Sequence, residues 1–380
     1  MSLEVKSVRN RWGLDEFITF PKQLYKCSRA WVPMFDIDYR RFFRKKHPFF
    51  QHAETEFLIV WLDNEPAARA MMIHNERYNA EHDRKAAQFY FIDFVDRDDV
   101  TDALFGAMAD WARARGLTEL MGPILSGATY GGGVLVDGFE HRAAMTMMPY
   151  NYAYYRAHYE RVGFIKHFDL LSLVVDPKQF RLPEKVERLA ERVRQRGHMK
   201  VLEFESKADL KRIAHEVARL YNPTLADHGE NYPLTDAELD QLIADLLQIA
   251  QPDLEKIITY DGEVVGFMLG FPDVTRAIQK SRGHLTPLSI LRLLWTTRRS
   301  RRLILNGMGI VERYQRLGGN ALIYSEIART VRGTERYEFD EAEMVQINEQ
   351  TDLMLADMKR LGAREYKRHR VYTKPVEGSS

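Results

Sequence analysis

The chain has 380 residues and a mass of 44.4 kDa, which is enough for two ordinary domains, each with its own core. Lys and Arg (55) balance Asp and Glu (54), so the net charge of +1 gives no global field that attracts nucleic acid or membrane. The single cysteine, Cys27, excludes an intramolecular disulfide framework and a cysteine-based zinc site. No apolar run reaches the roughly 18 residues of a membrane span, and we expect a cytoplasmic protein.

The first half of the chain alternates apolar strands with amphipathic helices. Strands are expected at 56–62, 67–73, 86–95, 117–124 and 169–175. A helix follows the third strand, with apolar residues at helical spacing from Val100 to Trp111, and another spans about 152–162 before Gly163. Gly131–Gly133 is followed by an apolar run and not by a helix, so it predicts a hairpin rather than a phosphate loop.

The second half repeats this order, which indicates the α/β class. Strands are expected at 256–260, 264–269, 303–311, 338–347 and 365–373, and helices at 208–221, 236–251, 320–332 and in a segment ending at Gly362. Thr235 is suited to cap the second of these helices. The charged stretch 183–197 is typical of a solvated linker helix. We therefore expect two domains, 1–180 and 199–376, joined by a linker helix at 181–198.

A basic insert at 272–302 distinguishes the second half from the first. Its cations are Arg276, Lys280, Arg282, Arg292, Arg298, Arg299, Arg301 and Arg302. They surround Pro287–Trp295, which is apolar and predicted to be helical. Such a segment suits a membrane surface or nucleic acid. The interpretation we prefer is a lid over the site with a solvated basic edge, because the net charge is close to neutral.

The strand at 303–311 leads into a short basic turn that is rich in glycine and opens a helix. A helix N-terminus presents unpaired backbone N–H groups and the positive end of the helix dipole. Gly318 and Gly319 have no Cβ, so a ligand can approach the backbone, and Arg313 and Arg316 add positive charge. The turn therefore predicts a binding site for a pyrophosphate.

The repeated order of elements, with Val311–Asn320 between strand and helix, resembles the GNAT acetyltransferase superfamily. The superfamily's turn motif, Arg/Gln-x-x-Gly-x-Gly/Ala, reads here Gln315-x-x-Gly318-x-Asn320, with asparagine in place of a small residue. The resemblance implies two tandem GNAT-type (acyl-CoA N-acyltransferase) domains with mixed central sheets flanked by helices. The complete chain is also similar to uncharacterised bacterial tandem GNAT proteins with a His-Pro-Phe-Phe-x-His-Ala segment, here His47–Ala53.

This resemblance implies acetyl-CoA, or another acyl-CoA, as co-substrate in the second domain. In the superfamily, pantetheine pairs with the strand that leads to the turn, and the thioester sits where two parallel strands splay apart. The cofactor-binding residues that the resemblance implies are Met308, Gly309, Ile310, Val311, Arg313, Gln315, Arg316, Leu317, Gly318, Gly319, Asn320 and Asn348. Asn348 has a competing role as the cap of the following helix.

The first half is similar to the superfamily in outline only. Its equivalent turn contains Asp96, Asp98 and Asp99, whose carboxylates suit a helix start but repel a pyrophosphate. We therefore expect 1–180 to be a degenerate GNAT-like domain that does not bind coenzyme A in the usual way.

Acyl transfer to an amine needs proximity, a proton acceptor and often an acid for the leaving thiolate. In the superfamily a tyrosine four residues before the helix-ending glycine often supplies the acid. Tyr159 holds that place in the first half, whereas the second half has Met358. We predict that Glu343 and Tyr372 are the catalytic residues instead. The alternative is that Glu343 is a solvated strand residue and that Tyr372 is a packed one. A cluster of tyrosines in the first half is predicted either to line a substrate pocket or to form a packed face. Its members are Tyr150, Tyr152, Tyr154, Tyr155 and Tyr159.

The expected function is acyl-CoA-dependent N-acyl transfer, with acetyl-CoA as the first choice, to an unidentified small-molecule or peptide amine. One alternative is a non-catalytic acyl-CoA-binding or scaffold protein. Another is a tRNA-dependent aminoacyl transferase, supported by the basic insert alone. The histidines lack metal-ligand spacing, so we expect no metal. We also expect no membrane partner and do not favour nucleic acid as a partner. The sequence does not decide whether the chain forms a homodimer.

Overall fold

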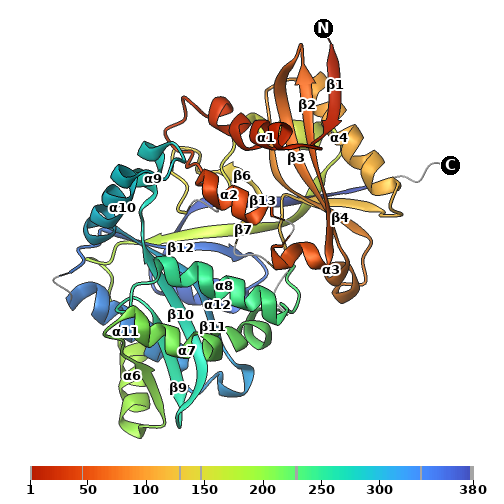
Figure 1. Ribbon diagram of the computed structural model, residues 1–380. Coiled ribbons are helices and arrows are strands. Elements are labelled where there is room, and N and C mark those ends of the chain that lie inside the picture. Colours follow the sequence, from red (N-terminus) through yellow and green to blue (C-terminus); the bar gives the residue numbers. More distant parts are fainter. Residues whose placement is uncertain are drawn as a thin grey trace. The chain divides into compact units, whose positions relative to one another are not determined.

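The computed structural model describes residues 2–44, 46–127, 130–145, 148–226, 230–333 and 336–376. The chain divides into two compact units, and Figure 1 shows their elements. Unit 1 contains Met1–Leu171, Thr275–Ile290 and Lys367–Ser380, and unit 2 contains Ser172–Val274 and Leu291–Tyr366. The units therefore interleave along the chain, because part of the basic insert and most of the last strand belong to unit 1.

Unit 1 is built on a sheet with the strand order β1-β2-β3-β4-β5-β13, and β6 also pairs with β13. The strands are β1 (Leu3–Ser7), β2 (Ala53–Leu62), β3 (Glu65–Asn75), β4 (Ala86–Phe94), β5 (Glu119–Gly122), β6 (Val134–Asp137), β7 (Ile165–Val175) and β13 (Arg364–Pro375). Neighbouring strands are antiparallel except β4 and β5, which are parallel. β7 and β13 contribute residues to both units.

Alternation along the strands gives unit 1 two packed faces. Its helices are α1 (Arg11–Leu24), α2 (Asp36–Phe42), α3 (Glu76–Glu81), α4 (Asp98–Arg113), α5 (Tyr154–Arg161) and α9 (Thr275–Ser281), with a 3-10 turn at Pro48–Gln51. Ala70 and Met72 of β3 join the core that includes α4, which lies beside β1, β2 and β3 in Figure 1. Met71 and Ile73 point the other way and pack with Phe17 of α1. Both faces of β3 are therefore buried.

Unit 2 has the strand order β12-β11-β10-β9-β8. The strands are β8 (Met199–Leu202), β9 (Lys256–Tyr260), β10 (Glu263–Pro272), β11 (Arg302–Ile310) and β12 (Glu341–Asn348). Only β11 and β12 are parallel among these neighbours. The helices are α6 (Glu184–Arg196), α7 (Lys207–Arg219), α8 (Asp236–Ile249), α10 (Pro287–Arg299, which begins in unit 1), α11 (Gly319–Gly333) and α12 (Asp352–Arg360), with short helical turns at Asn222–Ala226 and Glu312–Tyr314.

The helix predicted as a solvated linker, α6, is part of the body of unit 2. It lies beside α11 in Figure 1, with Ala190 and Val193 buried. The Arg194 guanidinium donates hydrogen bonds to Ser325 Oγ and Glu326 Oε1, at 2.6 and 2.9 Å. An apolar stripe and this polar contact fix α6 against α11, so its charged face is only its outer side.

Most predicted elements appear within a few residues of their expected bounds, and the α/β fold class is confirmed. Thr235 caps α8 as predicted, within a capping box that includes Glu238. The hairpin predicted after Gly131–Gly133 is wrong, because the strand that follows (β6) pairs with β13 from the far end of the chain. Gly133 permits this pairing, since it has a φ of +83° and a Cβ there would lie 2.9 Å from Arg370 N.

The basic insert does not act as a single segment. α9 packs within unit 1, where Arg142 Nε donates to Thr275 Oγ1 at 2.6 Å and Gln279 Nε2 donates to the Trp31 carbonyl at 2.7 Å. α10 begins with reciprocal bonds between Thr286 and Ser289, a side-chain cap that fixes its start. The lid role of the insert stays a prediction.

Candidate functional site

In unit 2, two parallel strands separate in the middle of the sheet. β11 and β12 pair along Arg302–Leu305 and Glu341–Met344, and β11 then continues to Ile310 with β10 as its only strand partner among the described residues. Leu269 of β10 faces two residues of β11 at a β-bulge, where Gly307 has a φ of +96°. Beyond Leu305 the described residues of β11 show no strand pairing with β12.

The turn after β11 keeps one exposed cation without a carboxylate partner. Arg313 forms an ion pair with Glu263, which also accepts a hydrogen bond from the Tyr314 hydroxyl at 2.9 Å. Gln315 Nε2 donates to the Ile310 carbonyl at 3.0 Å. Arg316 is exposed at a φ of +64° and forms no ion pair with any residue that the structure describes. Arg316 therefore has no competing carboxylate, whereas Arg313 shares an exposed ion pair with Glu263; phosphate binding by either arginine stays a prediction.

The two glycines at the start of α11 are explained by packing. Gly318 has a φ of +94°, and a Cβ on it would lie 2.6 Å from Val193 Cγ2 of α6. A Cβ on Gly319 would lie 2.8 Å from Ile310 Cδ1. Gly318 needs glycine, because its φ is left-handed and Val193 occupies the space beside it, whereas at Gly319 only the end of the Ile310 side chain would have to move. A role of these glycines in ligand approach stays a prediction.

The packing role of Gly318 can be measured by a double-mutant cycle. Gly318→Ala is expected to lower the free energy of unfolding by about 2–3 kcal/mol, since it combines a left-handed φ with overpacking. In a Val193→Ala background the same change should cost only about 1 kcal/mol, because the clash is removed and the backbone strain remains. Urea denaturation of the four proteins gives the coupling. Equal costs in both backgrounds would contradict this account of Gly318.

The two predicted catalytic residues lie in different units. Glu343 is on β12 of unit 2, buried to 1% exposure, two register positions before β11 and β12 separate and 3.6 Å from the Arg302 guanidinium. Tyr372 is on β13 in unit 1, where its ring stacks on Tyr159 at 5.0 Å between centroids. Burial raises the pKa of both tyrosines. The catalytic role of either residue stays a prediction, whereas the contact between the two tyrosines is a core contact of unit 1.

Asn348 ends β12 and holds the turn before α12. Its Oδ1 accepts the backbone N–H of Gln350 at 2.9 Å, and its carbonyl accepts the N–H of Thr351 at 3.0 Å. The α12 helix begins at Asp352 with Thr351 as its cap residue, so Asn348 shapes the approach to the helix rather than capping it. Binding of a cofactor amide by Asn348 stays a prediction.

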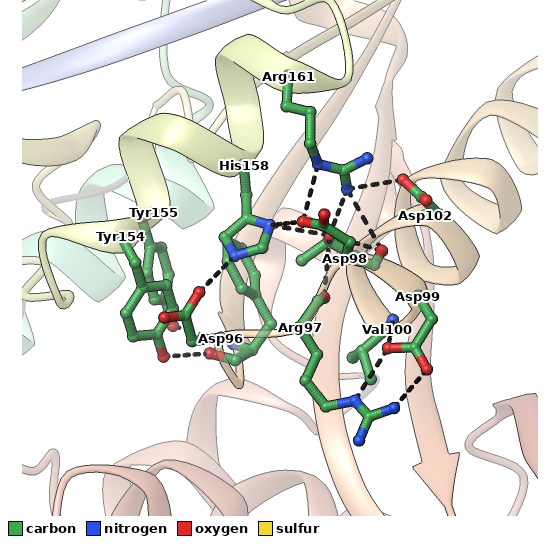
Figure 2. Close-up of polar contacts among 12 residues, drawn as sticks. Asp96, Arg97, Asp98, Asp99, Val100, Asp102, Tyr154, Tyr155, His158 and Arg161 are labelled. Atoms are coloured by element: carbon green, nitrogen blue, oxygen red, sulfur yellow. Dashed lines mark hydrogen bonds and ion pairs between the residues drawn. The ribbon is translucent and has the colours of Figure 1, made fainter. Parts of the chain in front are cut away.

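In unit 1 the equivalent turn is short, and its carboxylates contact side chains of the turn itself and of α5, as Figure 2 shows. β4 ends at Phe94 and α4 begins at Asp98. His158 Nε2 of α5 lies 2.8 Å from Asp96 Oδ1, and Arg161 Nε lies 3.0 Å from Asp98 Oδ1. The first turn of α4 thus carries the protein's own carboxylates with their own cationic partners, where an anionic ligand would otherwise bind.

Tyrosine hydroxyls complete the end of β4 in the same view. Tyr154 donates to the Phe94 carbonyl at 2.6 Å, and Tyr155 accepts the Phe94 N–H at 2.9 Å. The Tyr155 ring stacks on Phe94 at 4.0 Å. A bound chain would have to displace both hydroxyls to pair with this strand end. Unit 1 therefore fills with its own side chains the two places that unit 2 leaves open.

A buried ion pair, which no local sequence pattern indicates, lies beside the end of β4. Arg69 Nε donates to Asp93 Oδ2 at 2.7 Å, and the Tyr25 hydroxyl donates to Asp93 Oδ1 at 2.8 Å. Tyr25 also lies 2.8 Å from the Tyr155 hydroxyl. Burial raises the pKa of Asp93, while Arg69 and Tyr25 oppose that shift. The pair lines a pocket with an inner space of about 90 Å³ that is open to solvent.

His369 of β13 is buried near this pocket, and its Nε2 lies 3.0 Å from the carbonyl of Pro149. Burial, aided by the charge of Lys367, lowers its pKa from 6.5 to about 4. Between pH 6.5 and pH 4, His369 binds a proton in the unfolded chain but not in the folded chain. Unit 1 should therefore lose stability as the pH falls from about 6.5 to about 4, by at most about 3 kcal/mol. His369→Gln should reduce the difference in Tm between pH 7.5 and 5.0. An unchanged difference would contradict this assignment.

Unit 2 contains an apolar pocket that is open at its mouth; its inner space is about 70 Å³, and about 680 Å³ when the solvent at the mouth is included. Leu305 of β11, Met344 of β12, Ala328 of α11 and Met358 of α12 are among its lining residues. Met358, which stands where the superfamily often has a tyrosine, is therefore an apolar wall residue. Tyr324 and Arg332 are the polar residue types in the lining. The cavity suits a hydrocarbon group.

Comparisons with known proteins relate this geometry to other chains. No protein-family model matches. The chain is 27% identical over 387 residues to Protein YghO of Escherichia coli (strain K12), covering 98% of this chain and 95% of that protein. It is 28% identical over 389 residues to the Bacterial ceramide synthase of Caulobacter vibrioides, covering 98% of each. A solved tandem GNAT protein from the clavulanic acid biosynthesis pathway matches with a TM-score of 0.58, 10% identity and 100% coverage of both chains.

The chain has a tandem GNAT fold. A glucosamine N-acetyltransferase region in a fungal multi-domain GH3 β-N-acetylglucosaminidase matches as well, with a TM-score of 0.54 and 11% identity over 98% of this chain and 38% of that one. The predicted tandem GNAT architecture is thereby confirmed. Within the described residues, this tandem GNAT chain has no cluster of three metal-ligating side chains and no helix long and apolar enough to cross a bilayer.

Proposed function

We propose that the chain is an acyl-CoA-dependent N-acyltransferase whose coenzyme A binds at the β11–α11 turn of unit 2. One observation carries the proposal: β11 separates from β12 after Leu305 and leads to the start of a 15-residue helix beside the exposed Arg316. The open strand edge offers backbone groups to the pantetheine amides, and the helix start with Arg316 suits the pyrophosphate. Unit 1 has the same strand separation, but Tyr154, Tyr155 and the aspartates fill it.

The reaction would form an amide from an amine and a thioester. The amine nitrogen attacks the carbonyl carbon and gives its proton to a protein base, the carbon–sulfur bond breaks, and the base passes that proton to the departing thiolate. Glu343 is our proposed proton acceptor, because it lies close to the point where the strands separate. The Arg302 guanidinium lies 3.6 Å from the Glu343 carboxylate.

We infer that the acyl group is long rather than acetyl. The cavity of unit 2 lies over the paired ends of β11 and β12 and is lined almost wholly by apolar side chains. Each buried methylene contributes about 0.8 kcal/mol, so such a cavity favours a hydrocarbon chain over an acetyl group. A full-length relative is named a ceramide synthase, and a ceramide is an amide between a fatty acid and a long-chain amino alcohol. Long-chain amino alcohols are therefore the amines to test first.

Thiol release from acyl-CoAs of two to eighteen carbons, with amino alcohols and a panel of other amines, tests the proposal. We expect turnover that rises with acyl length, and a Glu343→Gln variant with a lower kcat and little change in KM. Binding of acyl-CoA without turnover of any amine would support the non-catalytic binding protein instead. Absence of both binding and turnover would refute the proposed function.

A further inference from the structure

One helix exposes most of its apolar side chains. On α10, Leu288, Leu291, Leu294 and Trp295 are between 59% and 65% exposed. At 100° per residue these four side chains fall on one side of the helix, while Ser289 is buried on the other side. Leu285, just before the helix, is 46% exposed as well. Contiguous apolar exposure of this kind marks an interaction surface.

Arg292 and Arg299 flank this stripe, Arg298 follows it at the end of the helix, and none of the three has a carboxylate partner among the described residues. The Arg299 guanidinium lies 5.1 Å from the centre of the Trp295 ring. Arg301 and Arg302, just beyond the helix, do pair with acidic residues. From residue 274 to residue 311 the sequence contains no Asp or Glu. The surface is therefore apolar along its centre and cationic at its border.

We propose that the exposed side of α10 docks on an anionic lipid surface. The leucines and Trp295 would enter the boundary between headgroups and acyl chains, and the arginines would contact lipid phosphates. The near-neutral net charge led us to expect no membrane partner. This proposal differs from that expectation because the positive charge is concentrated on and around α10. It does not depend on acyl transfer, although it would place the chain where long-chain amines are found.

The same features argue against other occupants of this surface. Two copies of α10 in contact would bring their bordering arginines together, with no acid on the helix to compensate them. A nucleic acid would meet the arginines but would leave the leucine stripe against phosphates or water. A lipid surface satisfies both parts, since apolar and anionic groups lie next to each other at its boundary.

Cosedimentation of the full chain with vesicles tests the proposal. We expect binding to vesicles of 70% phosphatidylcholine and 30% phosphatidylglycerol, and at least tenfold weaker binding to pure phosphatidylcholine or in 0.5 M salt. Leu291→Glu and Trp295→Glu should each weaken binding at least tenfold. Leu353→Glu is the matched control, because Leu353 of α12 is 86% exposed and lies outside α10. Thermal unfolding of each variant should match the parent.

Three outcomes would overturn the docking proposal. The first is no binding to anionic vesicles, and the second is binding that the α10 variants and Leu353→Glu change equally. The third is a dimer, detected by light scattering, that Leu291→Glu dissociates while vesicle binding is absent. Loss of vesicle binding in Leu291→Glu with unchanged turnover of soluble substrates would separate docking from the proposed chemistry.

Discussion

Replacing Asp93 with alanine is expected to lower the free energy of unfolding by about 3–5 kcal/mol. The change leaves the Arg69 guanidinium, itself 2% exposed, without its counter-charge in the core of unit 1. It also removes the acceptor of the Tyr25 hydroxyl, which lies against Tyr155. Because Tyr155 in turn holds the Phe94 N–H, the end of β4 should loosen together with the ion pair.

Urea denaturation measures this loss, and two variants make it specific. Arg156→Ala breaks an exposed ion pair with Glu160 on α5 and should cost no more than about 0.5 kcal/mol. Joint replacement of Arg69 by Met and Asp93 by Leu should recover part of the stability, since neither charge is then left alone. A loss below 1 kcal/mol for Asp93→Ala would mean that the ion pair does not organise this core.

Ala328→Phe is expected to change which acyl-CoA the protein prefers. Ala328 of α11 is 5% exposed and lines the apolar cavity of unit 2. A benzyl group there should exclude two to three methylenes of a long acyl chain, at about 0.8 kcal/mol each, which is roughly a thirtyfold loss in kcat/KM. On the proposed function, the activity with acetyl-CoA should change less than twofold, because an acetyl group would be too short to occupy the cavity.

The thiol-release assay with acetyl-CoA and hexadecanoyl-CoA measures this selectivity. Leu353→Phe is the control, since it adds similar bulk to an exposed position on α12 and should leave both activities unchanged. Overpacking alone costs about 1–3 kcal/mol of stability, so the assay temperature must stay below the Tm of the variant. Equal losses for both acyl-CoAs would show that the cavity does not hold the acyl chain.

Much of the fold could be predicted because local sequence patterns indicate most of the helices and strands. The strand at 256–260 has its predicted bounds, since an apolar run ends directly at the turn Asp261–Gly262. α1 was not predicted, because Pro21 lies inside it and aromatic residues weaken its helical pattern. The pairing of β6 with β13 depends on residues more than 200 positions apart, which no local pattern reveals.

The candidate site could be located but not interpreted in full. The basic turn was found from Gly318 and its neighbours, yet the reason for that glycine is Val193, on a helix that reads as a linker. The sequence predicts Arg313 as a phosphate ligand but does not indicate its exposed ion pair with Glu263, fifty positions earlier. Gly309 has a similar explanation, since a Cβ there would lie 2.8 Å from Thr224. In each case the deciding partner is distant in sequence.

The central claim is that coenzyme A binds at the β11–α11 turn, and isothermal titration with coenzyme A tests it most directly. We expect one site per chain. Arg316→Glu, which reverses the exposed charge, should raise the Kd at least tenfold. Arg97→Glu, at the equivalent turn of unit 1, should leave the Kd unchanged, because Arg97 already pairs with Asp99. No binding to the parent protein, or a Kd that responds to Arg97→Glu and not to Arg316→Glu, would contradict the account.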